Sequence, residues 1–222
     1  MADDDDLGLD AAYSLKTPQD SVRLYAKWAE SYDEGFAAEQ GYRTPAVIAT
    51  AFAEAATEHD TPLLDVGCGT GLLAAALPPS LQASLWGLDI SAQMLAVAEE
   101  KHLYQRLIEG NLLERLPFDD ATFGCILSAG TFTTGHVGPQ AFEELLRISK
   151  PDALFLVSVH AHYFHEAGFD MTFGELNQAG AITPIQTEAF DFYSHGDEDH
   201  AEDRGLLVSF RKKQTSSPAP FA

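Results

Sequence analysis

The stretch that decides the fold is Leu63-Leu64-Asp65-Val66-Gly67-Cys68-Gly69-Thr70-Gly71, and a second, Leu85-Trp86-Gly87-Leu88-Asp89-Ile90, supports it. The first begins with an apolar run, which predicts a buried strand at 63–66, and continues into three glycines. Glycine adopts positive φ easily and leaves no Cβ between the backbone and a ligand. The leucines and alanines that follow predict a helix, so the stretch is a strand, a tight loop and a helix N-terminus.

The acidic residue that ends the second strand indicates that the glycine loop binds a nucleoside. Asp89 lies 22 residues after Gly67. In open α/β sheets an acidic residue at this place accepts hydrogen bonds from ribose hydroxyls, while the loop holds the other end of the ligand.

The loop spacing argues against a dinucleotide. The third glycine of a dinucleotide site would stand at Leu72, and Asp65 at the mouth of the loop would repel a pyrophosphate. A carboxylate in a partly buried cleft attracts an ammonium or sulfonium group instead. A nicotinamide-dependent oxidoreductase therefore stays only as a third hypothesis, and a cationic ligand is favoured.

In these motifs the chain resembles the class I S-adenosylmethionine-dependent methyltransferases. The resemblance covers roughly residues 60–160 and runs on through Gly110-Asn111-Leu112, Leu116-Pro117-Phe118, 123–128 and 145–151. More loosely, 25–33 is similar to the leading segment of the methyltransferase-like proteins of the Williams–Beuren region. The resemblance implies a Rossmann-like α/β fold. Its seven-stranded sheet would be mostly parallel, with an antiparallel C-terminal hairpin and helices on both faces.

The same resemblance implies where S-adenosylmethionine binds. The glycine loop would surround the methionine part, Asp89 would bind the ribose and Met94 would cover the adenine, although Met94 fits a plain core position equally well. Asn111 departs from the family, which commonly has aspartate here; its carbonyl can still accept from the adenine amine, without charge assistance. The expected cofactor-binding residues are Tyr32, Asp65, Gly67, Cys68, Gly69, Gly71, Asp89, Ile90, Met94, Asn111, Leu112 and Ser128.

An aromatic set precedes the sheet. Tyr25, Trp28 and Tyr32 lie in the leading segment, which the resemblance folds over the cofactor. An aromatic face can stabilise a sulfonium by about 0.5–2 kcal/mol, but aromatics at helical spacing are also typical of a core. Both roles stay open, and Tyr32 is the preferred member for the site.

Methyl transfer is an in-line displacement that needs orientation above all, and it needs a base only when the nucleophile must lose a proton. Candidate bases lie beyond the predicted strands at 123–128 and 153–160. His160 and His162 would share a face if the second of these strands extended that far. No carboxylate has the local spacing of a metal site, and no metal is expected. The candidates are His136, His160, His162 and Tyr163, with His165 beside them.

The composition fits one domain of ordinary size and disfavours polyanionic partners. The chain has 222 residues, 34 acidic against 13 basic, and a formal net charge of −21. Such a field repels nucleic acid and anionic lipid, and the only basic run is Arg211-Lys212-Lys213. Cys68 and Cys125 predict two reduced, buried thiols. Without a signal-like or spanning segment, a cytoplasmic protein is expected, as monomer or homodimer.

The remaining pattern predicts alternating elements in a single domain over 18–213. Helices are expected at 19–31, 45–58, after Gly71, 91–101, 139–148 and 173–179, and further strands at 84–88, 104–108, 123–128, 153–160, 183–193 and 205–211. The first two helices (18–60) would cover the cofactor, 61–160 would be the cofactor-binding core, and 161–213 would complete the sheet. Residues 1–17, the charged loop 196–203 and the tail 214–222 lack periodicity, and the two ends are expected to be disordered.

Two functions from different classes remain. The first is a methyltransferase acting on an O, N or C nucleophile of a small molecule. The second is a non-catalytic S-adenosylmethionine-binding or interaction protein, which the lack of an unambiguous catalytic residue keeps open.

Overall fold

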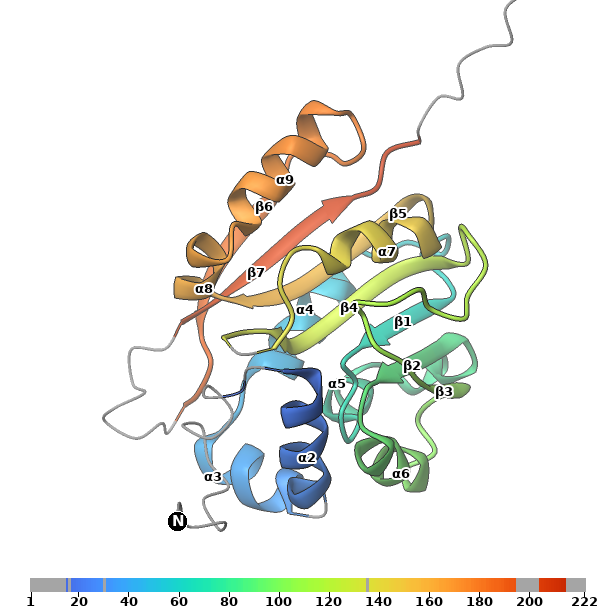
Figure 1. The fold of residues 1–222 in the computed structure, drawn as a ribbon. Coiled ribbons are helices and arrows are strands. Elements are labelled where there is room, and N and C mark those ends of the chain that lie inside the picture. Colours follow the sequence, from blue (N-terminus) through green and yellow to red (C-terminus); the bar gives the residue numbers. More distant parts are fainter. Residues whose placement is uncertain (1–14, 16, 30, 135, 195–203, 215–222) are drawn as a thin grey trace, which may run out of the picture.

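In the computed structural model, which describes residues 15, 17–29, 31–134, 136–194 and 204–214, one seven-stranded sheet runs through the centre of the molecule (Figure 1). The strands are β1 (Leu63–Val66), β2 (Leu85–Asp89), β3 (Arg106–Glu109), β4 (Phe123–Phe132), β5 (Ser149–His160), β6 (Gln186–Asp191) and β7 (Arg204–Arg211). Their order is β3-β2-β1-β4-β5-β7-β6. The β1 to β5 pairs are parallel, whereas β7 is antiparallel to both β5 and β6. This confirms the predicted fold class and its C-terminal hairpin.

The strand order reverses between β1 and β4, which places a binding site. β2 pairs with one side of β1 and β4 pairs with the other. Ligands of open α/β sheets bind beyond the carboxyl ends of the strands at such a reversal. The glycine loop that follows β1 lies at this point.

Helices cover both faces of the sheet; the six predicted helices are present among the described residues, and four further helical segments were not predicted. In chain order, the helices are α2 (Pro18–Trp28), the π-helix η1 (Tyr32–Ala37), α3 (Ala38–Gln40), α4 (Thr44–Ala55), α5 (Leu72–Ala76), the 3-10 helix η2 (Pro79–Ser84), α6 (Ala92–Glu100), α7 (Ala141–Ile148), α8 (Ala161–Glu166) and α9 (Phe169–Gln178). Local capping explains two starts: Thr17 and Asp20 form a capping box on α2, and the Ser91 hydroxyl accepts from the Met94 amide on α6.

Alternating side chains of the strands supply two separate cores. Leu64 and Val66 of β1 pack in one buried cluster, whereas Leu63, between the sheet and α4, belongs to the other. Successive side chains of a strand point to opposite faces, so a strand covered on both sides has no polar face. The second core joins β1 to Ile48 and Phe52 of α4.

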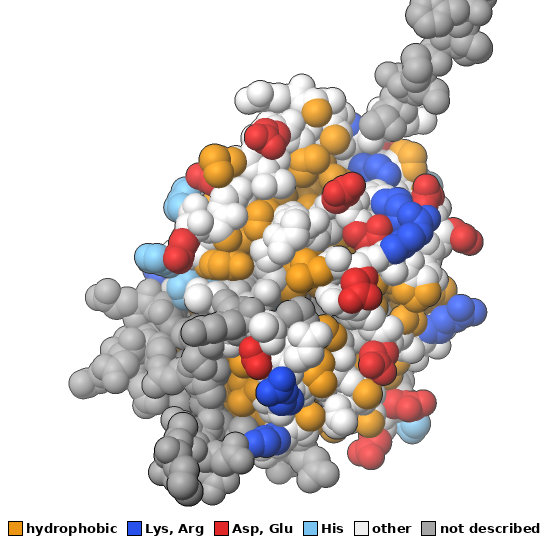
Figure 2. Space-filling model, viewed as in Figure 1, with side chains coloured by type: hydrophobic (Ala, Val, Ile, Leu, Met, Phe, Trp, Pro, Cys, Tyr) orange, Lys and Arg blue, Asp and Glu red, His pale blue; other side chains and the backbone are white. Residues whose placement is uncertain are grey.

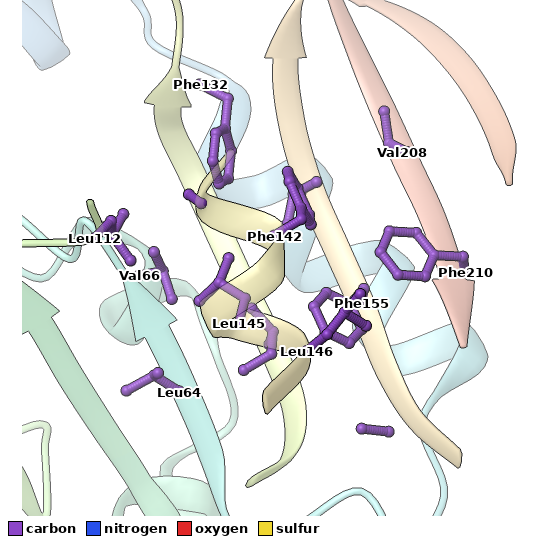
Figure 3. Close-up of a cluster of buried hydrophobic side chains, with 14 of the residues drawn as sticks. Leu64, Val66, Leu112, Phe132, Phe142, Leu145, Leu146, Phe155, Val208 and Phe210 are labelled. Carbon is purple, nitrogen blue, oxygen red and sulfur yellow. The ribbon is translucent and has the colours of Figure 1, made fainter. Parts of the chain in front are cut away.

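Phenylalanines dominate the core that α7 covers (Figure 3). The Phe142 ring lies 4.8 Å from Phe173, 5.1 Å from Phe132 and 6.1 Å from Phe210, measured between centroids. Phe155 stacks on Phe210 at 4.5 Å. These contacts tie α7 and α9 to β4, β5 and β7.

Four expectations about elements need correction. The first helix ends at Trp28 rather than 31, and η1 follows it. α8 was not predicted: β5 ends at His160 and the chain turns into a helix at once, so His160 and His162 do not share a strand face. β4 continues to Phe132 through four more residues than expected. The last helix begins at Phe169 rather than 173. The predicted loop 196–203 and most of both predicted tails lie outside the described residues.

No helix in the described part of the chain is long and apolar enough to cross a membrane.

Replacing Phe142 by alanine should destabilise the protein strongly. The ring is fully buried among five other phenylalanines, and deleting a buried phenyl ring leaves a cavity that costs about 3–5 kcal/mol. Urea unfolding monitored by circular dichroism measures this loss. Met171→Ala is the control, because Met171 is 69% exposed and should change the free energy of unfolding by less than about 0.5 kcal/mol. An equal effect of both variants would contradict the described core.

Candidate functional site

A cavity lies at the carboxyl ends of β1, β2 and β4, and the N-terminal helices close its other side. Both the glycine loop and Asp89 line it. The remaining lining comes from α2, η1, the start of α4, the turn after β3 and the segment after β4. Those residues include Ser21, Tyr25, Tyr32, Tyr42, Pro45, Asp65, Ile90, Met94, Gly110, Asn111, Leu112, Ala129, Gly130, Thr131, His136 and Val137.

Each of the three loop positions requires glycine for a different structural reason. All three have positive φ. A Cβ on Gly67 would collide with Thr131, whereas one on Gly69 would meet open space, so Gly69 is the position where the backbone is exposed to a ligand. Gly71 does not line the cavity; it is the left-handed N-cap of α5 and packs against the Tyr104 ring. Gly71 therefore shapes the loop without facing the cavity.

Asp89 holds the glycine loop as well as facing the cavity. Its Oδ2 accepts from the Gly69 amide at 2.8 Å and its Oδ1 accepts from the Ser91 amide at 2.8 Å. A carboxylate has about four acceptor positions, so both oxygens can still accept from ribose hydroxyls. Burial raises the pKa of Asp89, while these backbone amides lower it.

Asp65 is the most unusual group of the site. It is 1% exposed in an otherwise apolar strand. Its Oδ2 accepts from the Tyr104 hydroxyl at 2.7 Å, and its Oδ1 has no hydrogen-bond partner among the described residues. Burial raises its pKa to about 7; the Tyr104 hydrogen bond lowers it, and the neighbouring Asp89 charge raises it. A buried carboxylate oxygen without a partner is costly unless a cation or donor meets it.

The turn after β3 and the start of α6 give the cavity an apolar wall. Cys68, Met94 and Leu112 are buried and line it, together with Ile90. The Asn111 side chain also lines the cavity, but its Oδ1 accepts from the Leu113 amide at 3.0 Å and its Nδ2 donates to Glu114. The contact of Asn111 with adenine stays a prediction, and its oxygen would have to serve two donors.

Ser128, an expected cofactor residue, lies in the sheet away from the cavity. Its side chain is fully buried, and its hydroxyl donates to the Val66 carbonyl at 2.8 Å. It does not line the cavity. Ser128 therefore links β4 to the end of β1 through this hydrogen bond.

The aromatic residues of the leading segment have two different roles: two line the cavity and one packs in the core. Tyr25 and Tyr32 line the cavity, whereas Trp28 is 3% exposed and packs edge-on against Tyr32 at 5.2 Å. Trp28 therefore holds the tyrosines in place from the interior. Burial raises the pKa of Tyr32 well above its usual value, so its hydroxyl stays protonated.

The leading segment is tied to the cofactor loop by Asp33. Its carboxylate accepts from the Thr70 hydroxyl of the glycine loop and forms an ion pair with Lys101 after α6. η1 therefore contacts the loop and α6 simultaneously. Sequence reasoning missed this link, because no local pattern joins residues so far apart.

Only one candidate base faces the cavity. His136 lines it, whereas His162 is 81% exposed on its side chain and pairs with Glu166. Neither His160 nor Tyr163 lines it: His160 is buried beside Phe192, and Tyr163 packs against Phe169. His165 is exposed and pairs with Asp170. Of this group the structure brings His136 alone to the site.

His136 has a defined tautomer. Its Nδ1 lies 3.1 Å from the Thr134 carbonyl, which can only accept, so Nδ1 carries the proton. Nε2 of the neutral ring is then the acceptor for the Tyr25 hydroxyl at 2.8 Å. Burial lowers the pKa of His136, which keeps the ring neutral near pH 7.

Several site residues were not predicted. Tyr42 approaches Gly130 closely, Thr131 donates to the Val66 carbonyl, and Tyr104 supports Asp65. Tyr104 and Thr131 lie within segments that the sequence predicted as strand and loop, but nothing local marks either as part of a site. Their roles come from strand order and from the packing of the N-terminal helices.

The basic run near the C-terminus is used inside the protein. Arg211 pairs with the buried carboxylate of Asp60, and the Lys212 ammonium donates to the carbonyls of Leu146 and Ser149. Arg211 and Lys212 therefore do not form a free phosphate-binding patch.

The residues at the cavity fit the cofactor that the sequence resemblance implies. Asp65 Oδ1 can receive an ammonium, Asp89 can receive ribose hydroxyls, Gly69 leaves room for close approach, and an apolar wall at Met94 and Leu112 suits a purine.

Comparisons with known proteins agree with this geometry. A methyltransferase-domain family model matches residues 64–157. Methyltransferase-like protein 27 of Homo sapiens is 32% identical over 176 residues, which are 77% of this chain and 71% of the human protein.

Among solved structures, an S-adenosylmethionine-dependent methyltransferase of Thermotoga maritima aligns with a TM-score of 0.59 at 14% identity, over 87% of this chain and 99% of that one. The [4+2]-cyclase SpnF aligns with a TM-score of 0.64 at 18% identity, over 90% of this chain and 98% of that one. At such identities the structures show a shared fold.

Asp65→Asn should weaken the binding of S-adenosylmethionine and stabilise the folded protein. Because the pKa of Asp65 is raised, its favourable contribution to folding is complete below pH 4 and is lost as the pH rises through about 7. The variant should therefore be more stable than the wild type at pH 8, by up to roughly 4 kcal/mol. Wild-type affinity for S-adenosylmethionine should fall about tenfold from pH 8 to pH 6 as the carboxylate protonates, and the variant should bind weakly at both.

Calorimetric titrations and thermal unfolding at the two pH values measure both effects. Asp191→Asn is the matched control, since Asp191 is an exposed acid of β6. A variant that binds with the wild-type pH dependence would contradict a role of Asp65 in holding the ammonium.

Asp33→Ala should loosen the leading segment from the loop. It removes one partly exposed ion pair and one hydrogen bond to a charged group, together worth about 1–2 kcal/mol. The dissociation rate of S-adenosylhomocysteine should rise roughly 5- to 30-fold, measured by stopped-flow tryptophan fluorescence. Glu188→Ala, which removes an exposed acid of β6, should leave the rate unchanged.

Proposed function

This chain belongs to the S-adenosylmethionine-dependent methyltransferase family, and we propose that it transfers the methyl group to an O, N or C nucleophile of a small molecule. The observation that carries the proposal is Asp65 Oδ1. It is a buried acceptor without a partner among the described residues, in the same cavity as the glycine loop and Asp89.

Residues of the cavity would hold the donor at three points. Asp65 would bind its ammonium, Asp89 its ribose, and Met94 and Leu112 its adenine. When bound, S-adenosylmethionine supplies a methyl carbon on a sulfonium, whose sulfur leaves with the electron pair of the broken carbon–sulfur bond. An activated leaving group of this kind needs no acid from the protein.

The part played by the chain is then orientation, exclusion of water and acceptance of a proton. Tyr25 and Tyr32 close the cavity on the side away from the sheet. For a nucleophile that loses a proton, the Tyr25 oxygen would receive it while the Tyr25 proton moves to His136 Nε2 along their 2.8 Å hydrogen bond. His136 is suited to this step because it is neutral and its Nδ1 proton is fixed on Thr134. Alignment by itself can supply several kcal/mol of the rate enhancement.

The charge of the chain and the position of the cavity favour a small-molecule acceptor. A net charge of −21 opposes polyanionic acceptors, and Arg211 and Lys212 are engaged internally. The cavity lies between the strand ends and the N-terminal helices. Both points favour a small molecule over nucleic acid. The two buried free thiols, Cys68 and Cys125, are compatible with the reducing cytoplasm, where we place the protein.

Titration calorimetry with S-adenosylmethionine and S-adenosylhomocysteine tests the cofactor site. Micromolar binding is expected for both, and Asp89→Ala should lose at least tenfold in affinity because two ribose hydroxyls lose a charged acceptor. Asp191→Ala, which removes an exposed acid, is the control.

A methyl-transfer assay over an acceptor panel then tests the activity. Tight cofactor binding with no turnover of any acceptor would favour the non-catalytic alternative, whereas absence of cofactor binding would defeat the proposal.

A further inference from the structure

We propose that the end of the cavity between α2, the start of α4 and the end of β4 is an acceptor subsite for an aromatic ring compound. The compound would have zero or positive charge and a hydroxyl or amine. The proposal rests on the proposed function and adds the chemical class of the acceptor. It follows from the rings, the charges and the direction of the hydrogen bonds at this end.

Aromatic rings make up much of this end. Tyr25, Tyr32, Tyr42 and His136 all line it. The Tyr25 ring lies 5.6 Å from the His136 ring and 6.3 Å from the Tyr32 ring, between centroids. Rings at such distances offer edges and faces to a further ring, and their faces attract a cation.

The charges at the cavity are acidic or absent. Its charged side chains are Asp65 and Asp89, and no lysine or arginine lines it among the described residues. His136 stays neutral because it is buried. An anionic acceptor would lose its hydration without gaining a lysine or arginine partner, which costs several kcal/mol. The net charge of −21 would also slow its approach.

Two hydroxyl protons at this end are used within the protein. The Tyr25 hydroxyl donates to His136 Nε2, and the Thr131 hydroxyl donates to the Val66 carbonyl at 2.9 Å. The Gly130 amide is also used within the protein, since it donates to the Ser158 hydroxyl at 2.8 Å. With their protons committed, the oxygens of Tyr25 and Thr131 can offer a ligand only acceptor positions. A phenol or an amine can donate to an oxygen of this kind, whereas a carboxylate can only accept.

Three probes of similar shape and different charge test the proposal. Tyramine is a cation, 4-propylphenol is neutral and 4-hydroxyphenylacetate is an anion. Each is titrated calorimetrically into the protein alone and into the protein saturated with S-adenosylhomocysteine. We expect tyramine and 4-propylphenol to bind and 4-hydroxyphenylacetate to bind at least tenfold more weakly.

A charge placed on the cavity wall should change this order. Val137→Lys adds a cation to a lining residue and should raise the affinity for 4-hydroxyphenylacetate at least tenfold relative to tyramine. Met171→Lys adds the same charge at an exposed position of α9 outside the cavity and should change nothing.

Equal or tighter binding of the anion to the wild type, or no binding of any probe, would overturn the proposal. Failure of S-adenosylhomocysteine to bind is a separate result that defeats the proposed function, and the titrations of the protein alone would still report the charge preference.

Discussion

The site is organised around the burial of one carboxylate, that of Asp65. A charged group within a strand that is covered on both faces works against folding, and the same burial raises the pKa of Asp65. Tyr104 satisfies only one of its oxygens. The other oxygen has no hydrogen-bond partner among the described residues, and Asp65 lines the cavity that the glycine loop and Asp89 share, so a bound cation would offset the cost of this buried charge. The Asp65 carboxylate therefore favours ligand binding and lowers the stability of the free protein.

The second constraint is that the cofactor loop and the leading segment are joined. Asp33 contacts Thr70 of the loop and Lys101 after α6, and the same segment carries Tyr25 and Tyr32 into the cavity. The wall of the acceptor end thus depends on the docking of η1 against the loop.

The sequence predicted those features of the fold that depend on local patterns of residues. The strand, loop and helix at 63–76, the Ser91 cap of α6 and the position of Asp89 all follow from short-range periodicity and turn chemistry. The alternation of elements predicted the parallel part of the sheet, and the family resemblance implied the antiparallel hairpin. Prediction from the sequence failed where tertiary contacts decide: α8 interrupts the run of histidines, and Ser128 lies inside the sheet. For Trp28 it left the core and the site open, and the packing decided for the core. Tyr42, Tyr104 and Thr131 reach the site only through the packing of distant segments, which no window of sequence contains.

The fold by itself does not decide the reaction, since proteins described as a methyltransferase and as a [4+2]-cyclase share it with this chain. In this chain the cofactor end is built from the strand ends and the glycine loop, and the acceptor end from the N-terminal helices and the end of β4. Chemistry specific to this protein must therefore reside in the second set. Its described hydrogen bonds commit the protons of Tyr25 and Thr131 to the protein, which leaves oxygen acceptors and ring faces toward a ligand. Such an arrangement selects a donor-bearing, uncharged or cationic acceptor before any methyl group moves.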